Sequence, residues 1–99
     1  MAPDVRALVV IEIDANLHRD TLATPAVGAW SDSRTPGGWE LAARLTRREF
    51  AALADSLQIV PATATVDGHV AVIELPRAAY PGATRVSMRF DSDLLEPVR

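Results

Sequence analysis

The stretch Gln58–Leu75, QIVPATATVDGHVAVIEL, decides the fold of this chain. Its Asp67-Gly68 dipeptide tolerates positive φ and is typical of a two-residue hairpin turn. Pairing outward from that turn sets Val66 opposite His69 and divides the two strands into two faces. One face is mostly apolar and comprises Val60, Ala62, Ala64, Val66, His69, Ala71, Ile73 and Leu75. The other face mixes valine with polar residues and comprises Thr63, Thr65, Val70, Val72 and Glu74.

A helix is predicted immediately before this hairpin. Thr46 and Glu49 have the three-residue spacing of a capping box, which marks the start of a helix. Apolar residues then recur at i, i+3, i+4 and i+7, and these are Phe50, Leu53, Ala54 and Leu57. The sequence therefore predicts one helix over residues 47–57, begun after Thr46.

Strand periodicity recurs on both sides of these elements. Apolar residues alternate over 5–13, 39–45 and 85–90, and a further short strand is expected over 25–30. Helix is the competing interpretation for 39–45, because its residues favour helices. The capping box at Thr46 decides for a strand, because it places the helix start after this segment.

These elements together predict the α+β class, in a single small domain over residues 1–99. We expect a five- or six-stranded, mainly antiparallel sheet, with one helix (about 47–57) packed on one face. One helix cannot cover both faces of such a sheet. The second face, with Val70 and Val72, must then be exposed to solvent, covered by the segment 14–38, or covered by another chain.

Composition limits the function. The chain has 99 residues, 48% of them hydrophobic, and much of this fraction is alanine, so its core is thin. The net charge of -3 argues against nonspecific nucleic-acid binding. All ten basic residues are arginine, which indicates a high-GC bacterial or phage origin. There is no cysteine and no apolar run of membrane-spanning length, so we expect no membrane partner, no cofactor, and a cytoplasmic or virion location.

Asp14, His18 and Asp20 are the catalytic candidates. They lie near the end of a predicted strand and in the loop that follows it. Carboxylates beside an imidazole can bind a metal ion or act as acid and base. The spacing matches no known metal loop, and aspartate and asparagine are also common turn residues, so a solvated turn is the favoured interpretation.

Three arginines, Arg44, Arg47 and Arg48, gather around the predicted helix start. Two cations in the first turn oppose the helix dipole, and the free N–H groups there attract anions. The sequence therefore makes these arginines candidates for binding an anion. The alternative is that they extend into water or pair with Glu40 and Glu49.

Both tryptophans flank one polar stretch, AWSDSRTPGGWE, in which Trp30 and Trp39 are separated by eight residues. Two interpretations stay open. Each indole fills a core that has few other aromatic side chains, or the two form a cross-strand pair that holds up a projecting loop. Such a loop, closed by a Pro-Gly turn of type II and including Arg34, suits contact with another chain.

The sequence thus favours a non-enzymatic interaction or assembly module, as a subunit of a homo-oligomer or of a larger assembly such as a virion. The partner-binding candidates are Trp30, Arg34, Trp39, Val70 and Val72. The alternative is a small enzyme, or a protein that binds an anion or a metal ion, built on the loop with Asp14, His18 and Asp20.

Overall fold

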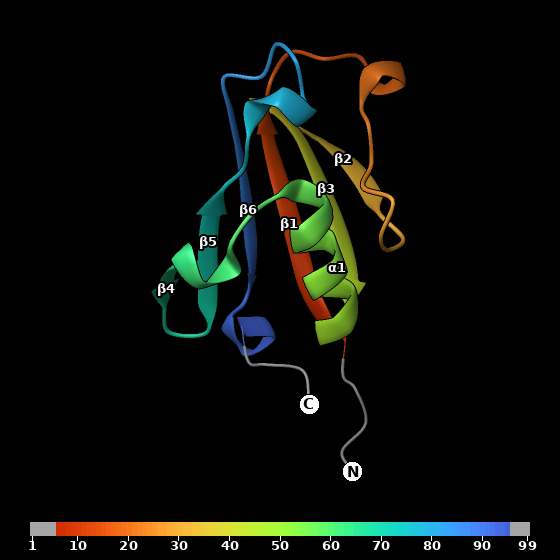
Figure 1. The fold of residues 1–99 in the computed structure, drawn as a ribbon. Helices are drawn as coiled ribbons and strands as arrows, with labels where there is room; N and C mark the ends of the chain where they lie inside the picture. Colours follow the sequence, from red (N-terminus) through yellow and green to blue (C-terminus); the bar gives the residue numbers. More distant parts are fainter. Residues whose placement is uncertain (1–5, 96–99) are drawn as a thin grey trace.

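A six-stranded antiparallel sheet forms the centre of the computed structural model, which describes residues 6–95 (Figure 1). The strands are β1 (Ala7–Asp14), β2 (Ser31–Thr35), β3 (Gly38–Leu45), β4 (Thr65–Asp67), β5 (Val70–Glu74) and β6 (Arg85–Asp91). Within the described part there are also one α-helix, α1 (Arg47–Leu57), and the short 3-10 helices η1 (Arg19–Thr21), η2 (Pro61–Thr63), η3 (Arg77–Ala79) and η4 (Ser92–Leu95). The predicted α+β class is confirmed.

The strand order is β2-β3-β1-β6-β5-β4, so β1 lies inside the sheet between strands from both halves of the chain. In β1, Ile13 lies opposite Trp39 of β3 and Val9 lies opposite Phe90 of β6. The strand predicted over 5–13 is therefore present as Ala7–Asp14, and Val5 lies outside the described residues. The strands predicted over 39–45 and 85–90 are also present.

The helix begins where the capping box predicts. Thr46 Oγ1 accepts a hydrogen bond from the Glu49 N–H at 3.1 Å, and the Glu49 carboxylate accepts one from the Thr46 N–H at 3.0 Å. These two bonds satisfy amide groups that have no partner within the helix. At the other end Gln58 takes a left-handed conformation with φ of 57°, and its N–H donates to Ala54 and Asp55.

The core lies on one face of the sheet, which we call the inner face. It is formed by alternate residues of the strands, chiefly Val9, Ile11, Ile13, Leu41, Leu45, Ala71, Ile73, Val86, Met88 and Phe90. Helix α1 lies in front of β1 and β3 and adds Phe50, whose ring centroid is 4.6 Å from that of Phe90 (Figure 1). The segment 15–30 packs side chains against the same core.

The opposite side, which we call the outer face, carries the other set of alternate residues. It comprises Leu8, Val10, Glu12, Glu40, Ala42, Arg44, Val70, Val72, Ser87 and Arg89. Since α1 and the segment 15–30 both pack on the inner face, nothing within residues 6–95 forms a second layer over the outer face.

The predicted hairpin is present, but the predicted pairing register of its two strands is wrong. Val66 pairs with Ala71 rather than His69, so the turn is Gly68-His69. Gly68 has φ of 63° and His69 has no positive φ, which is the pattern of a type II′ turn. Only glycine then takes the left-handed conformation, whereas a turn at Asp67-Gly68 would force it on Asp67 too. The pairing partner moves by two residues, so the side chains of Thr65–Asp67 and Val70–Glu74 stay on their predicted faces.

The first strand of this hairpin is much shorter than predicted. Residues Pro61–Thr63 form η2, and β4 covers only Thr65–Asp67. Proline has no N–H to donate to a sheet ladder, and its fixed φ suits the first position of a helix. Val60, Ala62 and Ala64 are therefore not strand residues.

The segment around the tryptophans also differs from the prediction. Residues 25–30 form no strand, and the stretch expected as a projecting loop is the β2–β3 hairpin with its turn at Pro36-Gly37. That turn is not of type II, since Gly37 has no positive φ. Trp39 lies opposite Arg34 rather than Trp30, so the two indoles are not a cross-strand pair.

Candidate functional site

The outer face exposes three large apolar side chains. Leu8 is 48% exposed, Val70 44% and Val72 38%. They come from two strands, β1 and β5, which β6 separates in the sheet. Val10 is buried between Ala42 and Arg89 in the neighbouring strands, and it continues the apolar surface of Leu8. The face expected from the sequence to carry Val70 and Val72 is thus exposed within the described residues.

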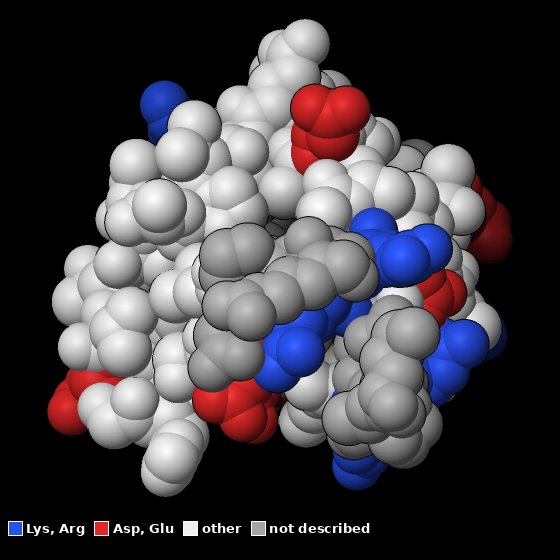
Figure 2. All heavy atoms as spheres, turned by 60° about the horizontal axis from the view of Figure 1, so that its bottom comes forward, with Lys and Arg blue, Asp and Glu red and all other residues white. Residues whose placement is uncertain are grey.

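A groove of about 670 Å³ opens at the end of the sheet next to these side chains. Several elements meet there: the start of β1, the ends of β3 and β6, the β4–β5 turn, the first residue of α1, and η4. Its lining is Arg6, Ala7, Leu8, Val10, Arg44, Arg47, His69, Val70, Arg89, Phe90, Asp91, Asp93 and Leu94. Figure 2 brings this end of the molecule forward and shows basic side chains gathered on it.

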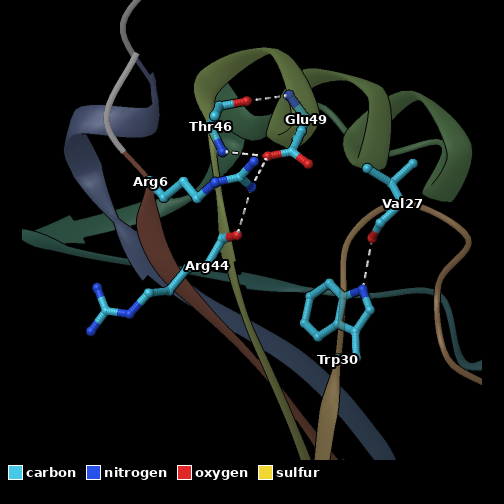
Figure 3. A network of polar contacts seen from close by, with 6 residues as sticks. All are labelled: Arg6, Val27, Trp30, Arg44, Thr46 and Glu49. Carbon is cyan, nitrogen blue, oxygen red and sulfur yellow. Dashed lines mark hydrogen bonds and ion pairs between the residues drawn. The ribbon is translucent and has the colours of Figure 1, made fainter. Parts of the chain in front are cut away.

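Two arginines of the groove are held by carboxylates of the chain that lie outside it. Arg89 Nη1 lies 2.6 Å from Glu12 Oε1 across the β1–β6 pair. Arg6 Nη1 pairs with Glu49 Oε1 and also reaches the Arg44 carbonyl at 3.4 Å, so it joins the start of β1 to the start of α1 (Figure 3).

The same contacts act on the Glu49 carboxyl. Its pKa is lowered from the usual value of 4.5, chiefly by the hydrogen bond from the Thr46 N–H and then by the positive charge of Arg6. Partial desolvation opposes this shift. Glu49 is therefore an ionised capping residue whose charge is matched by Arg6.

Arg47 and Arg44 differ from these two. Arg47 Nε donates to the Asp93 carbonyl of η4 at 3.1 Å, which ties the helix start to the C-terminal end of the described chain. The Arg44 guanidinium is exposed and has no hydrogen bond or ion pair with any residue of 6–95. Figure 3 shows its side chain pointing away from the cluster of Arg6 and Glu49. Arg44 is thus the cation of the groove that has no partner in the described chain.

The structure brings two of the three anion-binding candidates to this groove, and anion binding itself stays a prediction. Arg44 and Arg47 both line the groove, whereas Arg48 is exposed on α1 and does not. The sequence did not point to Arg6 and Arg89, which reach the groove from β1 and β6. They are 83 residues apart in the chain, and no local spacing relates them.

Asp14, His18 and Asp20 are not assembled into a site. Among residues 6–95 no group of three His, Cys, Asp or Glu side chains is placed to hold a metal ion. Asp14 ends β1 and uses its backbone carbonyl to accept bonds from Thr84. His18 is exposed and precedes η1, and its carbonyl accepts hydrogen bonds from Thr21, the last residue of η1. These exposed positions agree with the favoured interpretation of a solvated turn, and the alternative of an enzyme built on this loop stays a prediction.

Trp39 and Arg34 instead hold the segment 15–30 on the sheet, and Trp30 lies at the end of that segment. Trp39 is buried, and its Nε1 donates to the Leu17 carbonyl at 2.8 Å. Arg34 lies over the Trp39 ring, 5.1 Å from its centroid, and donates to the same carbonyl. Trp30 is half-buried and donates to the Val27 carbonyl at 2.7 Å. These contacts agree with the core-filling interpretation and place all three residues away from the outer face.

Comparison with protein-family models, curated proteins and solved structures finds no match to this chain. No helix within residues 6–95 has both the length and the apolar character needed to cross a membrane.

Proposed function

We propose that the chain is a non-enzymatic protein-interaction or assembly module and that its interface is the outer face. The single observation that carries this is the uncovered sheet. The described chain packs α1 and the segment 15–30 on the inner face, while the outer face leaves Leu8, Val70 and Val72 partly in water. Exposed apolar side chains grouped on one face are typical of interaction sites.

The partner that can be tested directly is a second copy of the chain, as expected for a subunit of a homo-oligomer. Two sheets that pack face to face bury the alternating residues of each, as in a β-sandwich. Val70 and Val72 on adjacent outward positions of β5 would then lie inside the contact. The cytoplasmic or virion location expected from the sequence remains part of the proposal and rests on the absence of cysteine.

The test is sedimentation velocity of the full chain over a concentration series, with the double variant Val70→Arg/Val72→Arg beside it. We expect the wild type to form a species larger than the monomer. The variant should remain monomeric, because two arginines would bring unpaired charge into the interface. Since both valines are partly exposed, its circular dichroism and thermal unfolding should match those of the wild type.

Val60→Arg is the matched control. Val60 is 62% exposed and lies in the connection between α1 and η2, away from the outer face. Val60→Arg replaces an exposed valine with arginine as the test variant does, but outside the proposed interface, so assembly should be unchanged. A wild type that stays monomeric at the highest concentration, or a double variant that assembles like the wild type, would contradict assembly through this face.

A further inference from the structure

We propose that the groove at the end of the sheet binds an acidic segment of a partner protein, in which carboxylate side chains neighbour bulky apolar ones. This inference rests on the proposed function, because the groove shares Leu8, Val10 and Val70 with the outer face. It goes further by stating the chemistry of the partner at one place on that face.

The charge of the groove is opposite to that of the chain. The whole chain carries -3, but the groove is lined by four arginines and His69 against two aspartates, Asp91 and Asp93. Arginine thus outnumbers aspartate in the lining of the groove, and two of the arginines are paired with Glu12 and Glu49, which lie just outside it. A cleft with an excess of one sign attracts ligands of the other sign, and it selects the end of the protein at which they bind.

Arg44 is the residue through which an anion is bound. Arg6 and Arg89 are each engaged by a carboxylate of the chain, and Arg47 bonds the Asp93 carbonyl. The Arg44 guanidinium can offer its paired N–H groups to a carboxylate without breaking an existing contact among residues 6–95. It lies near the end of β3, opposite Leu8 of β1, and this pairing orders its backbone.

Apolar surface on the other side of the groove decides what kind of anion fits. Leu8 and Val70 are each nearly half exposed, and Leu94 closes the end formed by η4. A bare phosphate or a nucleic-acid backbone leaves this apolar surface uncovered. A peptide with glutamate beside leucine matches both the cation and the apolar side chains, within a volume of about 670 Å³.

The test is a titration of the ¹⁵N-labelled full chain, followed by amide chemical shifts. The probe is a six-residue peptide of alternating leucine and glutamate, acetylated and amidated so that side chains carry its only charges. The matched probe has glutamine in place of each glutamate. We expect saturable shifts at Leu8, Arg44, Val70 and Phe90 with the glutamate peptide, and binding weaker by about tenfold or more with the glutamine peptide.

Two variants locate the contact. Arg44→Gln should weaken binding of the glutamate peptide by about tenfold, because it removes a charge-assisted hydrogen bond. Arg48→Gln makes the same change of charge at an exposed arginine outside the groove and should bind like the wild type. Raising the salt concentration should weaken the glutamate peptide and leave the glutamine peptide unaffected.

Several outcomes overturn the inference. They are equal binding of the two peptides, equal loss in Arg44→Gln and Arg48→Gln, shifts confined to other residues, and no saturable shift at all. None of these alters the sedimentation of the wild type and Val70→Arg/Val72→Arg. Failure of the groove is therefore distinguishable from failure of assembly through the outer face.

Discussion

At the scale of single residues, Gly38 is the position that tolerates least change. A Cβ built on it lies 1.9 Å from the Ile13 carbonyl oxygen and 2.8 Å from the Ala15 amide nitrogen, both of them backbone atoms that side-chain movement cannot relieve. We expect Gly38→Ala to lower the free energy of unfolding by about 3 kcal/mol or more. Urea denaturation followed by tryptophan fluorescence measures this.

Its neighbour Gly37 is the control. A Cβ there meets Asp14 Oδ1 at 3.8 Å, an ordinary contact, and Gly37 has no positive φ. Gly37→Ala should therefore change the free energy of unfolding by no more than about 0.5 kcal/mol. Equal effects of the two substitutions would show that β1 and β3 do not approach as closely as the structure has them.

Residue-scale rules also explain where the sequence-based prediction of the hairpin failed. Asp67-Gly68 and Gly68-His69 are both acceptable two-residue turns, and the glycine alone does not choose between them. The backbone chooses the turn in which only Gly68 needs a positive φ. The face on which each strand residue lies could be predicted, because side chains alternate with a period of two and a two-residue shift leaves them on the same face. The pairing register of the two strands could not be predicted.

At the scale of elements, the start of α1 should be sensitive to acid. The lowered pKa of Glu49 means that folding favours its ionised form, so its stabilising contribution is complete above the unfolded value of 4.5 and is lost as the pH falls through the lower folded pKa. We expect the difference in melting temperature between wild type and Glu49→Gln to shrink toward zero on acidification from neutral pH. Differential scanning calorimetry over this range measures it.

Arg6→Gln separates the two causes of that shift. The hydrogen bond from the Thr46 N–H is the larger cause, and it survives this substitution, whereas the charge of Arg6 is removed. The acid-dependent difference should therefore become smaller in the Arg6→Gln background without disappearing. Its complete loss would assign the shift to the ion pair instead of to the helix cap.

The elements themselves were predictable to different degrees. The capping box and apolar spacing predict α1 with its observed bounds, because both signals lie within a dozen residues. β2, with the sequence SDSRT, was not predicted, because an edge strand needs neither an apolar face nor β-branched residues when β3 supplies its hydrogen bonds. Pro61 is the residue that indicates a short first hairpin strand. It has no N–H to donate to a neighbouring strand, and this counts for more than the alternation of apolar and polar residues around it.

At the scale of the whole molecule, Tyr80 joins two loops at the end opposite the groove. It is buried, its hydroxyl donates to the Ala23 carbonyl at 2.9 Å, and burial raises its pKa above 10.0. A raised pKa stabilises the fold fully below the unfolded value and loses that contribution as the pH rises through the folded value. The chain has no lysine, no cysteine and no second tyrosine, so we expect Tyr80 to dominate its alkaline unfolding.

Tyr80→Phe tests this expectation. At neutral pH it should cost about 1 kcal/mol, the typical loss for one hydrogen bond, measured by urea denaturation. Above pH 10 the variant should lose less stability than the wild type, with tyrosinate absorbance reporting ionisation of Tyr80 in the wild type alone. An identical alkaline loss in both proteins would show that the hydroxyl is already accessible to water in the folded state.

The candidate site could be predicted only in its local parts. Val70 and Val72 share a face by strand periodicity, and Arg44 and Arg47 adjoin a helix start, so both pairs are visible in short windows of sequence. The groove needs Arg6 and Arg89 as well, and these meet only because β1 pairs with β6. Asp14, His18 and Asp20 show the converse, since their closeness in the chain does not make them a metal-binding group among residues 6–95.

The place of β6 between β1 and β5 has a consequence for biosynthesis. Until β6 is available, the sheet of β1–β3 and the β4–β5 hairpin are separate, because β6 is the strand that joins them. Val9 can pair with Ala43 of β3 early, but it finds its partner on the β6 side only when Phe90 has left the exit tunnel. The nascent chain therefore carries two unpaired sheet edges until β6 has left the exit tunnel, and chaperones that bind nascent chains have most to shield during that interval.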